Sequence, residues 1–585
     1  MAIQLFLNGT EVVPDSHQEI KVTKENPYFT LSDSYTLDVS LPIDIHQNRM
    51  FFKSLYRMEA SKVYREYDCR LISGNATVME GTARIVQVTG ELVKIQLAAG
   101  VSALKMSGEQ ENVYIDRLVS RPSGACITLG NVFLDPGWAD FALDGYHGYG
   151  VIMRDGSNDK VVNLCDLDAL FGRFPNYYSE CPRLTDIMRL VAAELGFEVD
   201  MSCLPAACNS IFVATAAQGS WGKKLPHWTV KEFMTQFQNF FGCTFIRSGS
   251  KSLRLVPLNE YAGNPVQVIE PVDEFQADFS DEDDVDGVMN SNIEFSMESS
   301  DTEIVDKEIL GKAKYSAEYT SESSMQAAFA NDSADVRMRK LYKLNGEVYI
   351  GWEIQEGQFA LRRIAPFNPL NRFEGADTVS LKIVPAYMQE DVECDIWISD
   401  LLGGMEKLTF SMAMPSVSNS YGMVSSLSGN QAEQEESPTM QGLVEGTETV
   451  IDEGDKPDVM NVVFIDGNTD EFVINTRGRG DVTFGLHAAF TDCNFKRQFT
   501  GNRSRWSFSL NDLPGFDFYL GQLHKIGFSC SHRVKHVIRF LADAIPDPTR
   551  IYIIRNKRFG CEKIEASIRD GQLDRLMTGY FYEML

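Results

Sequence analysis

One stretch of the chain, between Pro226 and Leu258, predicts a complete supersecondary unit from its residues alone. Thr229 and Glu232 have the spacing of a capping box, which begins a helix by satisfying its first backbone amides. Apolar residues then recur at intervals of three and four, the period of one helical face; they are Val230, Phe233, Met234, Phe237 and Phe241. Gly242 is expected to end the helix, because glycine accepts the left-handed conformation of a C-cap.

The residues after Gly242 predict a β-hairpin against which this helix lies. Residues 243–246 form a short apolar strand, 247–251 a polar turn and 252–256 the returning strand. We expect Phe233 and Phe237 to be buried against Leu253 and Leu255. The unit offers no nucleophile, ligand cluster or phosphate-binding loop, so its chemistry is packing, and this is the first indication of a structural function.

A second helix is predicted from Leu184 to Gly196, with Thr185 as its cap and an apolar face of Ile187, Leu190, Val191 and Leu195. The two helices and the hairpin together predict a small α+β domain over residues 181–262.

The N-terminal region has the pattern of an antiparallel β-domain. Asn8-Gly9 is the dipeptide preferred in a two-residue hairpin turn, and residues 35–41 alternate between apolar and polar up to Pro42. Similar alternation recurs at 68–71 and 93–97. Strands at this even spacing predict a β-barrel domain over residues 1–120.

Several of these segments resemble a known family. Asn26-Pro27-Tyr28-Phe29-Thr30, the strand 35–42, Asn48-Arg49 and the meander 81–100 resemble the first barrel of phage tail hub proteins, also called the baseplate hub or late control protein D-like family. The unit at 229–256 is similar to the small inserted domain of that family. The resemblance implies a homotrimer that caps the end of a tail tube, with a second barrel between about 288 and 412 that helps three chains to close a ring.

The remaining segments complete the predicted organisation, an α+β, mainly β fold with several antiparallel barrels or sandwiches and a small inserted helix-plus-hairpin domain. Residues 121–180 are predicted to be a loop-rich β extension, and 263–412 an acidic crossover followed by the second β-barrel domain. Strand patterns within the latter occur at 347–350, 359–364, 379–384 and 393–398. Residues 413–460 have the composition of a flexible linker or loop, and 461–585 predict a C-terminal β-rich docking domain, with a hairpin of strands 551–554 and 559–568 joined by a turn at 555–558.

The charge and cysteine content limit the classes of partner. The formal net charge is -28, from 82 acidic and 54 basic residues, which disfavours sequence-specific nucleic-acid binding. The same surplus suits a lumen past which DNA slides, or serves solubility alone. The 11 cysteines are scattered without a CxxC motif, which predicts reduced, mostly structural thiols and synthesis in a cytosol. We expect no signal peptide and no membrane span.

Two groups of residues have types used in catalysis or metal binding. Asp391, Glu393 and Asp395 alternate along one predicted strand near Trp397, and paired carboxylates are the groups that hydrolyse glycosidic bonds. Cys530, His532 and His536 are zinc-ligand types without an evident fourth ligand. Acidic residues are common throughout this chain, and ordinary surface or packing roles are the favoured interpretation of both groups.

Two shorter motifs have ordinary explanations as loops. Residues 281–287 carry five acidic residues and a glycine, but the alignment that puts Gly287 at the sixth position of a calcium loop puts Ile293 where a glutamate belongs. Residues 477–481 contain an RGD triplet, for which a flexible surface loop is the simpler interpretation.

The sequence therefore predicts a structural virion protein, not an enzyme, with no catalytic, cofactor-binding or metal residues and no cofactor. The expected location is the phage tail tip, after synthesis in the host bacterial cytoplasm. The expected partners are two further copies of the chain, the tail tube protein and the distal tail, spike or receptor-binding proteins. A tail-associated or cell-surface glycan hydrolase and a carbohydrate-binding adhesin remain as alternatives.

Overall fold

The computed structural model describes most of residues 3–584. Its longer gaps are 56–65, 109–112, 120–139, 163–180, 215–221, 280–292, 298–312, 365–376, 400–404, 416–458, 491–505, 511–515 and 526–529, with shorter gaps of up to three residues between them. The fold is mainly β with a few helices, as the sequence predicts. Among the residues that the structure describes, no helix is long and apolar enough to cross a bilayer.

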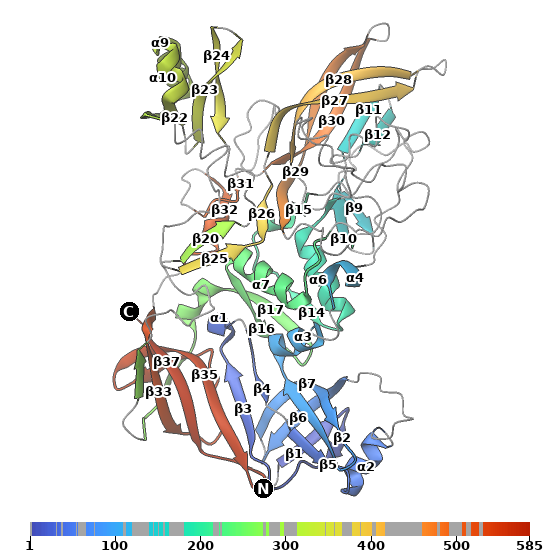
Figure 1. Ribbon diagram of the computed structural model, residues 1–585, viewed down its shortest axis with the longest axis vertical. Coiled ribbons are helices and arrows are strands. Elements are labelled where there is room, and N and C mark those ends of the chain that lie inside the picture. The colour runs from blue at the N-terminus through green and yellow to red at the C-terminus, as the bar shows by residue number, and fades with distance from the viewer. Residues whose placement is uncertain are drawn as a thin grey trace.

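The largest sheet is built from both ends of the chain (Figure 1). Its strands, in spatial order, are β19 (Gln276–Phe279), β33 (Cys530–Leu541), β37 (Leu576–Met584), β35 (Lys557–Arg569), β3 (Ile20–Glu25), β4 (Tyr35–Thr36), β8 (Leu92–Ala98), β7 (Ala76–Val88), β6 (Glu66–Ser73), β1 (Ile3–Leu7) and β2 (Thr10–Val12). Four short strands pair beside this path: β5 (Val39–Pro42), β18 (Val266–Val268), β34 (Ile551–Ile554) and β36 (Gln572–Leu573). One apolar core, which includes Leu41, Ile95, Ile564 and Phe581, is shared by both halves.

Pairing between β3 and β35 joins the two ends of the chain. The register runs from Ile20 opposite Ile568 to Glu25 opposite Lys563. The sequence placed these strands in two separate domains, and the structure makes them neighbours in one sheet. Figure 1 shows the blue N-terminal and red C-terminal strands side by side in the lower part of the molecule.

Two predicted turns form with small differences. Asn8 and Gly9 both have positive φ, of 48° and 77°, as a two-residue hairpin turn requires. The C-terminal hairpin also turns on two residues, Arg555 and Asn556, with φ of 47° and 68°. The sequence predicted a four-residue turn there, but Lys557 already pairs with Ile554. Within the strand predicted at 35–41, residues 35–36 belong to β4 and 39–41 to β5, while 37–38 lie outside the described residues.

The predicted helix and hairpin form as expected at the centre of the molecule. Helix α7 (Val230–Phe241) begins at Thr229 and ends at Gly242, which has φ 59° and ψ 37°. It packs on β16 (Cys243–Arg247), which pairs with β17 (Ser252–Pro257) in the antiparallel register of a hairpin. Strand β14 (Glu198–Asp200) adds to β17 in parallel. Phe233, Phe237, Leu253 and Leu255 are all buried, so this prediction is confirmed.

The second helix forms with a different N-terminus. Helix α6 (Leu184–Glu194) begins after Arg183, and no side chain caps it. Thr185, predicted as the cap, lies inside the helix and is buried, so that detail is wrong. Asp186 instead places a carboxylate in the first turn, where it forms an ion pair with Arg189 at 2.6 Å. Its negative charge also interacts favourably with the positive end of the helix dipole.

The strands predicted at 347–350, 359–364 and 393–398 all exist, and the strand predicted at 379–384 is interrupted at Lys382 and forms two shorter strands. Together these strands belong to four different sheets. In the first sheet, β23 (Glu347–Gln355) pairs with β24 (Gln358–Ile364). In the others, β25 (Asp377–Leu381) pairs with β20 (Ile293–Met297), β26 (Ile383–Pro385) with β29 (Met460–Thr476), and β27 (Met388–Ser399) with β28 (Met405–Pro415). An alternating apolar–polar pattern predicts a strand but not the strand it pairs with. The sequence pattern therefore did not distinguish a single barrel sheet from the four separate sheets.

Further elements surround the central unit. The α-helices are α1 (Pro27–Thr30), α2 (His46–Phe52), α3 (Gly100–Gly108) and α4 (Ile115–Leu118), and the 3-10 helices are η1 (Ala206–Ser210), η3 (Leu258–Gly263) and η5 (Leu520–Gln522). The strands are β9 (Asp140–Leu143), β10 (Tyr146–Tyr149), β11 (Val151–Asp155), β12 (Asn158–Val162), β13 (Cys181–Pro182), β15 (Ile211–Val213), β30 (Gly480–Phe490), β31 (Trp506–Ser507) and β32 (Phe518–Tyr519). The predicted linker at 413–460 lies almost wholly outside the described residues.

A small module at 315–364 contains two helices that the sequence analysis did not predict. Helices α9 (Glu322–Asn331) and α10 (Ala334–Arg339) are capped by Ser321 and Ser333. They accompany a four-stranded sheet of β21 (Tyr315–Tyr319), β22 (Lys340–Leu344), β23 and β24. Figure 1 shows the module at the upper left, away from the large sheet.

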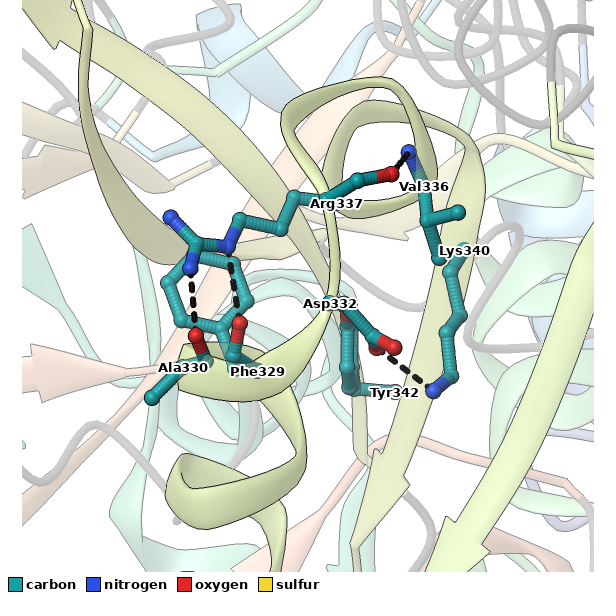
Figure 2. Close-up of polar contacts among 8 residues, drawn as sticks. Phe329, Ala330, Asp332, Val336, Arg337, Lys340 and Tyr342 are labelled. Atoms are coloured by element: carbon teal, nitrogen blue, oxygen red, sulfur yellow. Dashed lines mark hydrogen bonds and ion pairs between the residues drawn. The ribbon is translucent and has the colours of Figure 1, made fainter.

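Polar contacts fix the corner between these two helices, as Figure 2 shows. Asp332 Oδ2 accepts hydrogen bonds from Lys340 Nζ at 2.6 Å and from the Tyr342 hydroxyl at 2.7 Å. Arg337 donates to the carbonyl oxygens of Phe329 and Ala330, at 2.8 and 2.6 Å, and so satisfies the C-terminal end of α9. The module is therefore ordered by its own contacts as well as by its small apolar core.

Candidate functional site

The segment Asn26–Thr30, which carries part of the family resemblance, lies where the large sheet meets the α7 unit. Asn26 is fully buried. Its Nδ2 donates to the carbonyl oxygens of Pro548 at 2.9 Å and Cys561 at 2.7 Å, and its Oδ1 accepts from the Tyr28 amide at 3.1 Å. Its own amide donates to Glu562 O at 2.7 Å. One side chain thus holds β3, α1 and two C-terminal segments together.

Aromatic rings from three parts of the chain pack next to Asn26. The Tyr261 ring lies 5.0 Å from that of Tyr28 and 5.5 Å from that of Phe29. Phe29 also stacks on Tyr582 of β37, at 6.0 Å. The Phe29 ring fits closely over Gly560, where any side-chain carbon would overlap it. The Tyr261 hydroxyl donates to Arg550 O at 3.2 Å, so its polar end is satisfied.

A short chain of hydrogen bonds continues from α1 to α7. Thr244 of β16 donates from Oγ1 to Pro27 O at 2.7 Å. Gln238 of α7 donates from Nε2 to Thr244 Oγ1 at 3.1 Å. Gln238 and Thr244 are buried, so these bonds form away from water, where an unmade bond costs most. We call the set of Asn26, Tyr28, Phe29, Thr244 and Tyr261 the three-way joint.

Charged groups border the joint on the side of β3. Lys24 Nζ donates to Ile545 O at 3.3 Å, and burial lowers the pKa of this amine against the attraction of Asp547 and Asp33. Burial raises the pKa of the Asp33 carboxyl, although hydrogen bonds from Ser34 oppose the change. Arg247 reaches the same region and donates to Glu80 O at 2.8 Å. The contact between the large sheet and the α7 unit therefore contains partly desolvated charge.

The raised pKa of Asp33 predicts a pH dependence of stability. Between the unfolded pKa of about 3.9 and the higher folded pKa, the folded chain binds more protons than the unfolded chain. Stability is therefore lost from this group as pH rises through that window. Asp33→Asn removes the titration but keeps an oxygen for the Ser34 amide, so the stability of this variant relative to the parent should increase as pH rises from about 3.5 to 7.

Urea unfolding at a series of pH values measures this difference. Asp570→Asn is the matched control, because Asp570 is an exposed turn residue. If Asp33→Asn and Asp570→Asn shift the curves by the same amount at every pH, the half-buried Asp33 carboxyl does not contribute as stated.

The opposite side of α7 is held by a different segment. Gln236 accepts from the Lys382 amide at 2.8 Å and donates to Ser380 O at 3.3 Å. Lys382 Nζ pairs with Glu232 Oε1 at 2.6 Å. Thr229 accepts from the Glu232 amide at 3.2 Å, as the capping box predicts, but the Glu232 carboxylate is used for Lys382. The chain from β25 to β26 therefore contacts α7 at Lys382, the residue that separates these two strands.

The predicted carboxylate group lies on β27. Glu393 and Asp395 occupy alternate positions opposite Ser411 and Thr409 of β28. Asp391 lies where the register shifts between Gln389 and Val392, so a bulge separates it from the regular alternation. The strand predicted here is confirmed, and the side chains of these three residues are outside the described part of the structure.

The predicted cysteine–histidine group lies on β33. Cys530 is buried at the start of the strand. His536 is half-buried, packs edge-on against Phe559 at 5.3 Å, and has a pKa lowered by burial. Among the described side chains, no three groups of ligand type come together in a metal-binding arrangement.

The two loop motifs fall mostly in the gaps. Residues 281–287 lie outside the described residues. Residues 477–479 do as well, but Thr476 and Gly480 pair with each other. Gly480 and Asp481 of the RGD triplet are thus the first residues of β30 and lie in a strand, not in the predicted flexible loop.

The joint contains residues whose roles the sequence did not reveal. Asn26 was part of the family resemblance, but no local pattern assigned it a contact, and Tyr261 was not singled out. Lys382, which holds the opposite side of α7, was not singled out either. The available signal was weak: Asn26-Pro27 marks the end of a strand, and a buried asparagine needs partners. What the joint does chemically is to hold backbone segments in fixed relation through satisfied hydrogen bonds and ring packing.

Comparisons with known proteins find similar solved structures but no matching family model or curated protein. No protein-family model matches the chain, and no curated protein matches it. Among solved structures, it is similar to the 43 kDa tail protein of prophage MuSo2 from Shewanella oneidensis, with 8% identity, a TM-score of 0.31 and coverage of 99% of this chain and 97% of that one. It is also similar to a tail protein from Neisseria meningitidis MC58, with 8% identity, a TM-score of 0.29 and coverage of 100% and 96%.

Proposed function

We propose that this chain is a structural virion protein, the hub at the distal end of a phage tail tube, where three copies form a ring that connects the tube to the tip or spike. The observation that carries the proposal is the three-way joint. The segment on which the family resemblance rests, Asn26–Thr30, is committed to holding β3, the C-terminal strands and the α7 unit together. A hub must hold its neighbouring proteins in fixed positions, and this segment would make the chain rigid enough to do so.

The charge of the chain supports the same function. A net charge of -28 gives a surface that repels a polyanion. DNA passing through a ring of such chains slides without sticking. The partners in this proposal are two further copies of the chain, the tube protein and the distal tail proteins.

We expect the purified chain to form trimers. The proposed ring requires apolar surface between subunits, whose burial supplies the free energy of association. Multi-angle light scattering of the full chain alone should give three times the mass of 65.7 kDa. With the tube protein present, the complex should contain three copies of this chain. Negative-stain images should show a central opening. A chain that stays monomeric at high concentration and beside the tube protein contradicts the proposal.

A glycan hydrolase is the second candidate function, because β27 carries three acidic residues within five positions. We propose that they are not catalytic. Phage carrying Asp391→Asn, Glu393→Gln and Asp395→Asn together should assemble and infect normally, and so should phage carrying His532→Ala with His536→Ala. Infectivity and particle morphology by electron microscopy provide the measurement. Particles that assemble fully but lose both infectivity and polysaccharide cleavage support the hydrolase.

A further inference from the structure

Exposed apolar side chains gather on one flank of the large sheet. Of the nine large apolar side chains that are exposed in the described part of the chain, five lie on β18, just after it, or at the paired ends of β33 and β37. We call these five the valine strip; they are Val266, Val268, Val272, Leu541 and Leu576.

Backbone pairing brings the members of the strip together. β18 pairs with β34, and the chain then crosses to β33, where Pro271 lies opposite Phe540. Leu541, the next residue of β33, lies opposite Leu576 of β37. This register puts the two leucines beside residues 270–272, so the strip is one continuous surface.

The strip faces away from the core of the sheet. Ile269 is buried in that core, whereas Val268 and Glu270 on either side of it are exposed. Successive side chains of an extended chain point to opposite sides, so Val266, Val268, Glu270 and Val272 share the outer side. An exposed apolar patch of this kind marks a site of protein–protein contact.

A second exposed apolar surface lies on α2. Met50 is 62% exposed, and the exposed Lys53 follows three positions later, on the same side of the helix. Residues 46–53 contain two basic residues, Arg49 and Lys53, and no acidic residue. Arg49 donates only to backbone carbonyl oxygens, at 3.2 and 3.3 Å. The surface of α2 is therefore apolar and positively charged, on a chain whose net charge is -28.

The charge around the valine strip has the opposite sign. Residues 266–272, 539–543 and 574–576, which carry the strip, contain three acidic and two basic residues and so have a net charge of -1. One acidic and one basic residue of this set, Asp543 and Arg575, pair with each other at 2.8 Å. The strip and α2 are therefore complementary in charge, and both are apolar.

The two surfaces lie at opposite ends of the large sheet. β33 and β37 are the second and third strands from one end, and α2 packs on β2, the strand at the other end. Figure 1 shows α2 at the lower right and β33 and β37 at the lower left. α2 therefore cannot cover the strip of its own chain. Copies that join through two different surfaces form a filament or, when the rotation closes, a ring.

We propose that α2 of one copy packs on the valine strip of the next copy, with Met50 against the valines and the positive charge of α2 next to Glu270. This inference rests on the proposed function, because it names the contact between neighbouring subunits of the ring. Two chains with a charge of -28 repel each other. A second copy can therefore bind only where the local charges attract, and α2 against the strip meets that condition.

One substitution on each surface tests the contact in the full chain. Val268→Asp and Met50→Asp should each raise the concentration of half-assembly by about tenfold or more, because the contact would bury an unpaired carboxylate. Met338→Asp is the matched control, since Met338 is 41% exposed on α10 in the separate module, and it should leave assembly unchanged. Analytical ultracentrifugation measures assembly, and unfolding curves show that each variant is folded.

Mixing the two variants tests whether the contact joins different surfaces. A Val268→Asp copy keeps an intact α2, and a Met50→Asp copy keeps an intact strip, so a single contact can form between them. At a concentration where each variant alone is monomeric, the mixture should give a dimer with one copy of each and no ring. Met50→Asp copies that pair with themselves would show that the strip binds another strip, which overturns the proposal.

A charge swap tests the contact through exposed residues, whose replacement should not disturb folding. Glu270→Lys and Lys53→Glu should each weaken assembly, and the double variant should recover most of the loss, because opposite charges then meet again. Losses that simply add in the double variant contradict the proposed contact.

The same measurements separate this inference from the proposed function. A parent chain that stays monomeric, even beside the tube protein, contradicts both. A trimer that tolerates Val268→Asp and Met50→Asp leaves the ring in place and overturns only the contact between α2 and the strip.

Discussion

Replacing Asn26 by alanine is expected to lower the free energy of unfolding by roughly 3–5 kcal/mol. The substitution leaves three buried backbone groups without their present partners: the oxygens of Pro548 and Cys561, and the amide of Tyr28. Each such group costs about 1–3 kcal/mol. The measurement is chemical unfolding of the full chain, with hydrogen exchange to locate the loss at α1 and residues 545–565.

Two further variants sharpen this test. Asn26→Asp keeps the acceptor for Tyr28 but turns a second oxygen toward two carbonyl groups, so it should destabilise at least as much as alanine. Asn209→Ala is the matched control, because Asn209 is an exposed asparagine of η1, and it should change stability by less than about 0.5 kcal/mol. If Asn26→Ala behaves like the control, the three-way joint does not hold the molecule together.

The features that sequence predicted well are those specified within a few neighbouring residues. Asn8 and Gly9 take up positive φ because few other residue pairs do so at low cost. Helix α7 begins and ends at Thr229 and Gly242 because both signals lie next to an apolar face of the right period. In each case the local preference and the buried contacts agree, which is the condition for reliable prediction.

The features that sequence missed depend on distant partners. Asn26 and Cys561 are 535 positions apart along the chain, and no local pattern records that β3 pairs with β35. The apolar alternation of both strands is satisfied by any partner that covers the same face. The candidate site could therefore be found only as a resemblance, and its contacts came from the structure.

Some predictions failed in detail because a local sequence signal was weak or was outweighed by packing in the core. Thr185 has the residue type of a cap, but burial of its side chain in the core places it inside α6. Helices α9 and α10 begin at Ser321 and Ser333, and Met325 and Phe329 form a four-residue repeat on α9. Those signals were present in the sequence, but the small apolar face of α9 made them weak.

Replacing Phe237 by alanine is expected to destabilise the α7 unit by roughly 3–5 kcal/mol. The Phe237 side chain is fully buried. Its ring lies 4.8 Å from that of Phe241, 6.0 Å from that of Phe233 and 6.2 Å from that of Phe245 on the hairpin. Alanine leaves a cavity between helix and hairpin, and the rings around it lose contacts that no rearrangement of a single residue restores.

This loss of stability should depend on the volume of the side chain at position 237, and not on the helix propensity of the new residue. Phe237→Leu fills most of the same space and should cost clearly less than alanine. Lys231→Ala changes an exposed position of the same helix and should alter stability by less than about 0.5 kcal/mol. Unfolding curves and hydrogen exchange over residues 229–258 compare the three variants, and light scattering measures the effect of each variant on the proposed trimer. Because α7 contacts both the hairpin and Lys382, a loosened helix should weaken the contacts on both sides. Coincident curves for Phe237→Ala and Lys231→Ala would show that the helix does not depend on the hairpin for its stability.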